Sequence, residues 1–379
     1  MSVRAANTLT ARWTSLLDGR QTVLSGAGVY PLLALLAPYA AGPARTELLA
    51  VAASPADFGL DNSPTTRLAL GFWSRAELPL TEQWLRAVPE SLRGELTGDS
   101  EVDQPVLDRW AAERTGGLIP AMPVAVDADT VMLLASALLV LTDWVERFEE
   151  DSRRPQAGPW RGRDLVGLHR RTRDLSVLRV ARTPAGPVTL LTVVGRDDVD
   201  VVLVLGEPAR PAPEVLPAAI GALAGRSALA IEAGPGVRTE IVAAADDRPE
   251  LVVSTVGFTV SGDHDLSAHA TLFGLRSAMD ASDGHFPGIS PVPLFVSQAR
   301  QSATATFGAT GFKAAAVTAM SMMAGSARPV TTKRKQLVRV DFDRPFGFLA
   351  VHRPTGLVLV AGWVTDPEPY PDTASSSES

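Results

Sequence analysis

The side chains best suited to chemistry in this sequence are its five histidines, two of which, His264 and His269, lie close together. Asp265 follows His264 directly, and a helix would place both imidazoles near one face. Imidazole and carboxylate groups bind metal ions, yet the sequence has neither a His-Glu-x-x-His motif nor a zinc-finger spacing. A turn after a strand accounts for the same residues without a ligand. We therefore expect no metal site.

Two other short stretches could bind an anion or a phosphate. Ser25-Gly26-Ala27-Gly28 superficially suggests a phosphate loop or a nucleophile elbow, but it lacks the lysine of the first and the Gly-x-Ser-x-Gly spacing of the second. Ser25 fits the start of a helix better. Residues 333–335, Lys-Arg-Lys, fit a solvated polar loop. Because no convincing active site emerges, we expect a binding or inhibitory protein without a cofactor, not an enzyme.

Composition removes further classes of function. Apolar residues make up 46% of the 379 residues and charged residues 20%, which is typical of a globular chain. Cysteine is absent, which excludes a disulfide framework, thiolate catalysis and cysteine-ligated metal sites. A net charge of −7 argues against nucleic acid as a partner. Length alone would allow two or three domains.

One uncharged run, residues 22–44, has the length of a membrane span. Pro31, Pro38 and several glycines interrupt it, so a buried helix in a soluble protein fits better. No membrane partner is expected. Residues 1–8 have no apolar core like that of a secretory leader. The sequence therefore favours the cytoplasm, with leaderless export left open.

Hydrophobic patterning predicts a helical N-terminal third followed by a β-rich remainder. We expect a helix over residues 105–114, and either a buried strand or a buried helix over residues 131–140. Residues 188–194 and 199–205 form a predicted hairpin, and residues 251–260 form a strand that ends in a turn at 261–263. Residues 303–307, 346–351 and 357–364 are further predicted strands.

The most informative stretch is residues 308–336, which is long, rich in small residues and without a core-facing pattern. Long segments of this kind are usually functional or disordered. An exposed segment of this composition is also a preferred site of proteolysis. The sequence therefore predicts an exposed loop that a protease attacks, although a tolerated surface loop would have the same composition.

Several weak motifs follow one another in a fixed order along the chain. They include Phe342-Asp343-Arg344-Pro345-Phe346, Thr355-Gly356 before Gly362-Trp363, Gly288-Ile289-Ser290, Trp110 with Thr115-Gly116, Trp144 with Phe148, and Ser25 with Gly42. In this order and spacing, from about Leu9 to Pro367, the chain resembles the serpin superfamily in a bacterial-type form. Gly347 departs from the family pattern, which has an apolar side chain there.

The resemblance implies an α+β serpin fold, with three β-sheets, eight or nine helices and an exposed reactive-centre loop at about residues 311–336. It implies one domain over residues 1–370, a disordered polar tail over 371–379, and a metastable, monomeric protein. It also implies a suicide-substrate mechanism. A target serine protease attacks the loop and forms a covalent acyl complex, and the cleaved loop then enters the large sheet as a new strand.

The resemblance places the hinge of this loop at Gly311. Because side chains alternate between the two faces of a strand, the inserted segment would point Phe312, Ala314, Ala316 and Thr318 to the core. Lys313, Ala315 and Val317 would point the other way. Phe312 stands where the family has threonine, and overpacking by the ring would cost about 1–3 kcal/mol. We expect it to slow insertion, not to prevent it. The acidic pair usual before the glycine is replaced by Ala309 and Thr310.

The resemblance also implies polar residues that hold the centre of the large sheet. Ser25 matches the family, whereas Gly28 replaces a serine, Ser136 an asparagine and Gln301 a histidine. Trp144 would lie at the top of the sheet. The altered set leaves open how firmly the sheet resists opening.

The usual hinge length places the scissile bond near Gly325 and Ser326, with Ala324, Arg328 and Arg334 as alternatives. Small residues here favour an elastase- or subtilisin-like target, and Arg334 would suit a trypsin-like one. Phe312 and the altered central residues also favour a second hypothesis, a serpin that does not inhibit and serves as a binding, carrier or storage protein.

Overall fold

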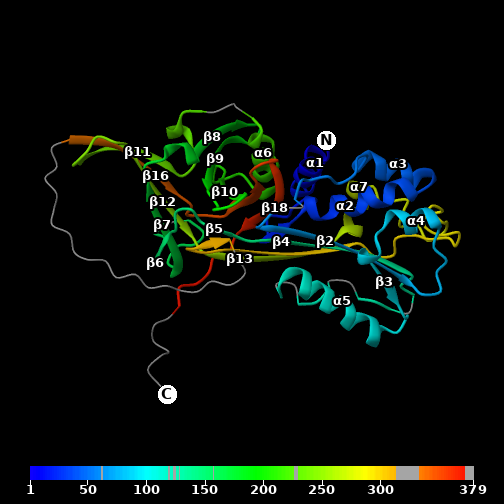
Figure 1. The fold of residues 1–379 in the computed structure, drawn as a ribbon. Helices are drawn as coiled ribbons and strands as arrows, with labels where there is room; N and C mark the ends of the chain where they lie inside the picture. Colours follow the sequence, from blue (N-terminus) through cyan, green and yellow to red (C-terminus); the bar gives the residue numbers. More distant parts are fainter. Residues whose placement is uncertain are drawn as a thin grey trace, which may run out of the picture.

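The computed structural model describes the chain except for residues 61–62, 118–119, 123–124, 128, 157, 226–228, 313–332 and 372–379. Most of the predicted loop and nearly all of the predicted tail therefore lie outside the described residues. Figure 1 shows the arrangement of the helices and sheets.

The described residues contain seven α-helices, fewer than the eight or nine that the resemblance implies. The remaining helical segments are 3-10 turns of three or four residues. No helix in the described ranges is long and apolar enough to cross a membrane. The helices are α1 (Ser2–Thr14), α2 (Gly26–Leu36), α3 (Gly42–Val51), α4 (Glu82–Ala87), α5 (Ser100–Thr115), α6 (Ala212–Leu223) and α7 (Ala270–Phe273).

The uncharged run forms a buried helix, as predicted. Helix α2 begins after Ser25, whose side chain accepts a hydrogen bond from the backbone N–H of Gly28. Pro31 lies inside the helix, and most residues of the helix are buried. The helix predicted at 105–114 begins earlier, at Ser100, because Asp99 caps it. It ends as predicted, at Gly116 in the left-handed conformation.

A six-stranded antiparallel sheet forms the best-buried part of the fold. Its strand order is β1-β18-β17-β10-β9-β8, and helices α1 and α6 pack against it (Figure 1). The hairpin predicted for residues 188–194 and 199–205 is confirmed, and the strands predicted at 346–351 and 357–364 pair with each other. Its strands are β1 (Thr22–Leu24), β8 (Leu178–Thr183), β9 (Gly186–Val193), β10 (Val199–Leu205), β17 (Phe346–His352) and β18 (Leu357–Val364).

A five-stranded sheet has the order β11-β16-β12-β7-β6 and lies at the end of the molecule far from α3 and α4 (Figure 1). Residues 333–336, predicted to belong to the loop, instead begin β16 and pair with β11. The loop prediction was wrong there because β11, which is distant in the chain, offers these residues hydrogen-bond partners. The strands are β6 (Glu149–Arg153), β7 (Leu165–Thr172), β11 (Val237–Ala244), β12 (Glu250–Val256) and β16 (Lys333–Asp341).

The large sheet consists of two hydrogen-bonded parts. One part has the order β13-β14-β15-β5 and the other β3-β2-β4, and α5 lies across the second part (Figure 1). The run at 131–140 is therefore a strand, β4. The strands are β2 (Thr66–Arg75), β3 (Arg93–Leu96), β4 (Met132–Val140), β5 (Thr142–Asp143), β13 (Phe258–Asp265), β14 (Arg300–Phe307) and β15 (Gly311–Phe312).

The strand predicted at 251–260 is two strands, and the turn predicted at 261–263 is wrong. The backbone N–H of Gly257 donates to the carbonyl of Val166 (2.9 Å), and its own carbonyl accepts from Glu368 (2.9 Å). At this glycine the chain passes from the five-stranded sheet into the large sheet. Residues 261–263 lie inside β13, paired with β14, so the Ser-Gly-Asp sequence forms no turn.

Candidate functional site

The two parts of the large sheet meet at β14 and β4, and strand β15 enters between them at one end. Phe312 pairs with Phe307 of β14 on one side and with Thr142 of β5 on the other. β5 continues the line of β4 after Leu141. Beyond β15, no strand in the described ranges separates β14 from β4, and these two are not hydrogen-bonded neighbours.

A narrow slot runs between β14 and β4. Its cavity volume is about 20 Å³, close to the space of a single water. A further strand needs about 4.8 Å of width, so the slot must widen before a strand can enter. The side chains that line it come from β4, β14, β15 and the start of α2, and they include Ser136, Leu138, Val140, Gln301, Ala303, Thr304 and Phe312.

Phe312 is buried before any insertion takes place. Its side chain is 2% exposed, and its ring lies 6.1 Å from that of Phe348 in the six-stranded sheet. The inward direction predicted for Phe312 is therefore what the structure has. The space that the ring needs already exists at this end of the slot.

Trp144 holds the segment that leads into β15. Its indole N–H donates to the carbonyl of Gly308 (2.9 Å), and its backbone N–H donates to that of Thr310 (2.9 Å). The backbone N–H of Phe148 donates to Ala309 (2.9 Å). Trp144 is fully buried, and its ring lies 5.0 Å from that of Phe307. These contacts fix the turn from which the hinge starts.

Ser25 and Gln301 join the central helix to β14. The backbone N–H of Ser25 donates to Oε1 of Gln301 (2.7 Å), and Nε2 of Gln301 donates to the carbonyl of Ser25 (2.8 Å). The Ser25 hydroxyl donates to the carbonyl of Leu359 in β18 (2.5 Å). A Cβ at Gly28 would lie 3.1 Å from Nε2 of Gln301, and Ser136 lines the slot opposite Gln301. The four predicted central residues are therefore brought together.

The remaining predicted residues lie elsewhere. The hinge residues Lys313, Ala314, Ala315, Ala316, Val317 and Thr318 and the bond residues Ala324, Gly325, Ser326 and Arg328 lie outside the described residues. Arg334 lies in β16, paired with Ala243. An extended segment inside a sheet is a poor protease substrate, which argues against Arg334 as the cleavage position.

Two of the three basic residues at 333–335, Lys333 and Lys335, have acidic neighbours. Nζ of Lys335 forms an ion pair with Glu250, which also contacts Nη1 of Arg171 (3.3 Å), and Lys333 lies 3.8 Å from Asp247. The hydrogen bond from Lys335 is the main cause that lowers the pKa of Glu250 below its ordinary value of 4.5. These contacts anchor the strand that follows the loop.

The histidine cluster does not form a metal site among the described residues. Nε2 of His264 lies 3.0 Å from the carbonyl of Val23 and 3.1 Å from Oγ1 of Thr22. Burial lowers the pKa of His264, so it favours the neutral imidazole. His264 therefore joins β13 to β1.

Sequence reasoning missed Arg170. It lies on the buried face of β7 with its guanidinium over the ring of Phe148, 4.7 Å from the ring centre. Arg170 is buried between the half-buried His169 and the exposed Arg171. Its place two residues after Leu168, on the same face of the strand, was the available signal.

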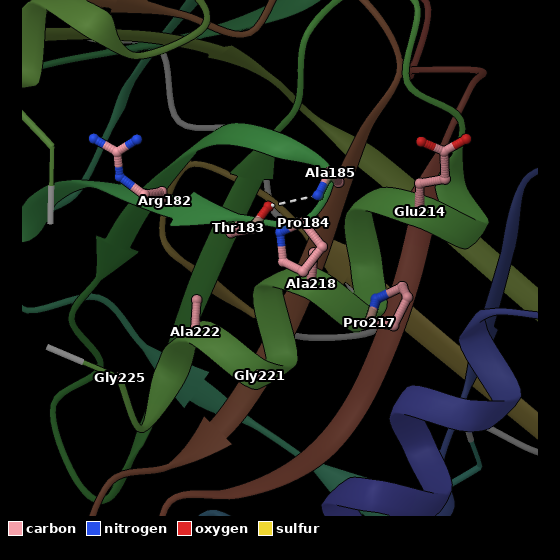
Figure 2. A pocket seen from close by; sticks show the side chains of 10 residues that line it. All are labelled: Arg182, Thr183, Pro184, Ala185, Glu214, Pro217, Ala218, Gly221, Ala222 and Gly225. Carbon is pink, nitrogen blue, oxygen red and sulfur yellow. Dashed lines mark hydrogen bonds between the residues drawn. The ribbon is translucent and has the colours of Figure 1, made fainter. Parts of the chain in front are cut away.

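A larger pocket, about 620 Å³ in volume, lies away from the slot (Figure 2). It is formed by the turn between β8 and β9 and by one face of α6, with Pro184, Pro217 and Ala218 in its wall. Arg182 and Glu214 lie toward opposite ends (Figure 2). Among the described residues, neither Arg182 nor Glu214 forms a hydrogen bond or ion pair with the large sheet.

Comparisons with known proteins identify relatives and solved structures that are similar to this chain. Residues 247–367 match the family model described as Serpin (serine protease inhibitor). The chain is 25% identical over 279 residues to "Serine proteinase inhibitor 1" of Myxoma virus (strain Lausanne), covering 72% of this chain and 68% of that protein. It is 42% identical over 77 residues to "Putative serpin-Z6C" of Oryza sativa subsp. japonica, a match that covers 20% of this chain and spans only 18% of the rice protein.

Solved structures match over nearly the whole chain. Native protease nexin-1 with heparin has a TM-score of 0.71 at 16% identity, covering 97% of this chain and 98% of that one. Thyroxine-binding globulin in complex with thyroxine has a TM-score of 0.70 at 17% identity, covering 97% and 99%. Identities this low establish the fold alone. Together these matches confirm the resemblance inferred from the sequence.

Proposed function

We propose that this chain, which has the serpin fold, inhibits a serine protease by acting as a suicide substrate. Serpins as a class are protease inhibitors and not catalysts. The observation that carries the proposal is strand β15, which already lies between β14 and β5 at the end of the slot. Among the described residues, the edges of β14 and β4 that face the slot beyond β15 pair with no strand, so a cleaved loop could continue from β15 along it.

The register of β15 predicts where each hinge residue would lie after insertion. Continued in steps of two residues, Ala314 would lie between Ala305 and Val140, and Ala316 between Ala303 and Leu138. Ala314 and Ala316 are themselves small and their β14 neighbours are alanines, so little overpacking is expected.

The next inward position in this register is Thr318. It would lie between Gln301 and Ser136, whose polar atoms can bond its hydroxyl. The polar residues at the centre of the sheet would thus receive a polar side chain.

The chemistry would follow ordinary acyl transfer. The protease serine oxygen attacks the carbonyl carbon of the scissile bond, near Gly325, and its proton passes to the protease histidine. The C–N bond to Ser326 then breaks, and the histidine returns that proton to the leaving amine. The loop remains joined to the protease by an ester until hydrolysis. Insertion before hydrolysis would trap this ester.

The experiment combines denaturing electrophoresis with mass spectrometry. The protein is mixed separately with a pancreatic elastase, a subtilisin and a trypsin, each with a matched sample whose catalytic serine is blocked. We expect a covalent band with elastase or subtilisin and a C-terminal peptide that begins at or near Ser326. An Ala316→Arg variant should be cleaved without a covalent band, because a charge would enter the core. Cleavage of the wild type without any covalent band would overturn the proposal.

The alternative is a serpin that binds or carries a partner without inhibition. It is favoured by the pocket between α6 and the β8–β9 turn, and by the altered residues Gly28, Ser136 and Gln301. The melting temperature after loop cleavage separates the two. Insertion of about ten residues should raise it by about 10 °C or more, because newly buried strand surface stabilises the sheet. An unchanged melting temperature would favour the carrier function.

A further inference from the structure

Residues 144–148 form a short segment, called the strap, that crosses the end of the large sheet. Backbone and side-chain N–H groups of the strap bind all three carbonyls of residues 308–310. The same residues 308–311 form the turn between β14 and β15, closed by a hydrogen bond from the N–H of Gly308 to the carbonyl of Gly311 (3.1 Å). Any strand that continues from β15 begins at this turn, so the strap fixes the position from which such a strand would start.

The strap is itself held by a buried arginine from the five-stranded sheet. The side chain of Arg170 is 6% exposed. Its Nη1 donates to the carbonyl of Glu146, in the middle of the strap (3.0 Å), and its guanidinium lies 4.7 Å from the ring centre of Phe148. Phe148 in turn packs against Phe307 of β14, with 5.7 Å between the ring centres.

Burying this arginine is costly, which indicates that its position matters. Its Nε is buried without a hydrogen-bond partner among the described residues, and the Glu146 carboxylate lies 3.9 Å away and is half exposed. Burial lowers the pKa of Arg170, which Glu146 partly offsets. An apolar residue would fill the same place without this cost. The stacking on Phe148 and the bond to the strap backbone are the contacts that an apolar residue could not supply.

We infer that Arg170 is a positioning residue, which acts through Phe148 and the strap to fix the turn from which the loop inserts. The inference rests on the proposed inhibitory function. When the strap is loose, the turn at residues 308–311 can move, and a cleaved loop enters the slot more slowly. Hydrolysis of the ester then competes better with insertion. More inhibitor is consumed for each protease molecule trapped.

The test compares Arg170→Met and Arg170→Lys with Arg171→Met. Arg171 is the neighbouring arginine on the same strand, but it is 73% exposed and contacts Glu250 instead of the strap. Hydrogen–deuterium exchange of a peptide that covers residues 144–148 reports the strap directly. We expect exchange of the Trp144 and Phe148 amides to be about tenfold faster in Arg170→Met, and unchanged in Arg171→Met. Arg170→Lys should lie between, because it keeps a cation near the ring.

The second readout is the number of inhibitor molecules consumed per protease molecule trapped. We expect a rise of roughly two- to fivefold in Arg170→Met, the loss typical of one cation–π contact. If Arg170→Met fails to fold, Arg170→Lys carries both measurements. Unchanged strap exchange in the folded Arg170 variants, or equal acceleration in Arg171→Met, would overturn the inference. If the wild type traps no protease at all, the proposed function fails, yet the exchange measurement still decides whether Arg170 positions the strap.

Discussion

The six-stranded sheet and the large sheet are built from similar strands but differ in how they are closed. All eight residues of β18 are buried, and the ladder from β1 to β8 is unbroken. The large sheet is divided between β14 and β4. Valine and leucine fill the space in the first sheet, whereas Gly28, Ser136 and Ala303 leave a slot in the second. Small side chains therefore line the division in the large sheet, whereas large apolar side chains fill the interior of the six-stranded sheet.

The largest effect should come from the finished sheet. Phe346 is fully buried against Phe342, Phe258 and Trp160. Phe346→Ala should lower the free energy of unfolding by about 4 kcal/mol, because a cavity remains in a packed core. Urea denaturation measures this, with Phe295→Ala as the exposed control. Equal losses of unfolding free energy in Phe346→Ala and Phe295→Ala would contradict the view that the six-stranded sheet is tightly packed.

The next effect concerns the entrance of the slot. Phe312→Ala should lower the stability of the uncleaved protein by about 3 kcal/mol, since the ring is already buried against Phe348. Thermal denaturation of the intact chain tests this. If the variant melted like the wild type, the ring would not be seated before cleavage, and the end of the slot would be open.

A matched pair of alanines compares the two sheets directly. Ala361 is fully buried in β18, whereas Ala303 of β14 lines the slot. Ala361→Leu should cost about 2 kcal/mol through overpacking, and Ala303→Leu less than about 1 kcal/mol. Both are measured by urea denaturation of uncleaved protein. Similar costs would mean that the slot is packed as tightly as the finished sheet.

A smaller effect is expected where the two sheets are joined. Ser25 caps α2 and donates to Leu359 of β18. Ser25→Ala should lower stability by about 1 kcal/mol, the usual value of a helix cap. Ser25→Thr, which keeps the hydroxyl, should recover part of that loss. Identical melting temperatures of the wild type and Ser25→Ala would show that the Ser25 cap does not contribute to stability.

The smallest effect is a pH dependence in the five-stranded sheet. The hydrogen bond from Lys335 lowers the pKa of Glu250 below 4.5, so its ionised form stabilises the folded state above that pH. This contribution is lost as the pH falls through the lowered pKa. Melting temperatures of wild type and Glu250→Gln should therefore differ at neutral pH and converge in acid. Glu82→Gln, at an 87% exposed side chain, is the surface control.

Short sequence patterns correctly predicted those elements whose formation depends on neighbouring residues, such as a turn or a helix cap. The hairpins and the start of α2 at Ser25 followed from turn residues and capping. The break at Gly257 was missed because the apolar run continues through it, and only Val166 and Glu368 from distant segments create the change of sheet. Lys333 and Lys335 were taken for loop residues because their acidic partners lie far away in the chain.

By itself, the sequence determined the apolar strands, the capped central helix, the absence of thiol chemistry and the family resemblance, because each depends on residue type and short spacing. Only the tertiary structure decided that β15 lies between β14 and β5, that Phe312 is already buried, and that Arg170 holds the strap. The pairing of β15 with β5 joins segments more than a hundred residues apart in the chain. The contact of Arg170 with Glu146 depends on a strand face that alternation alone cannot assign to the strap. Their physical basis is packing and hydrogen bonding between strands, which exist only once the sheets have formed.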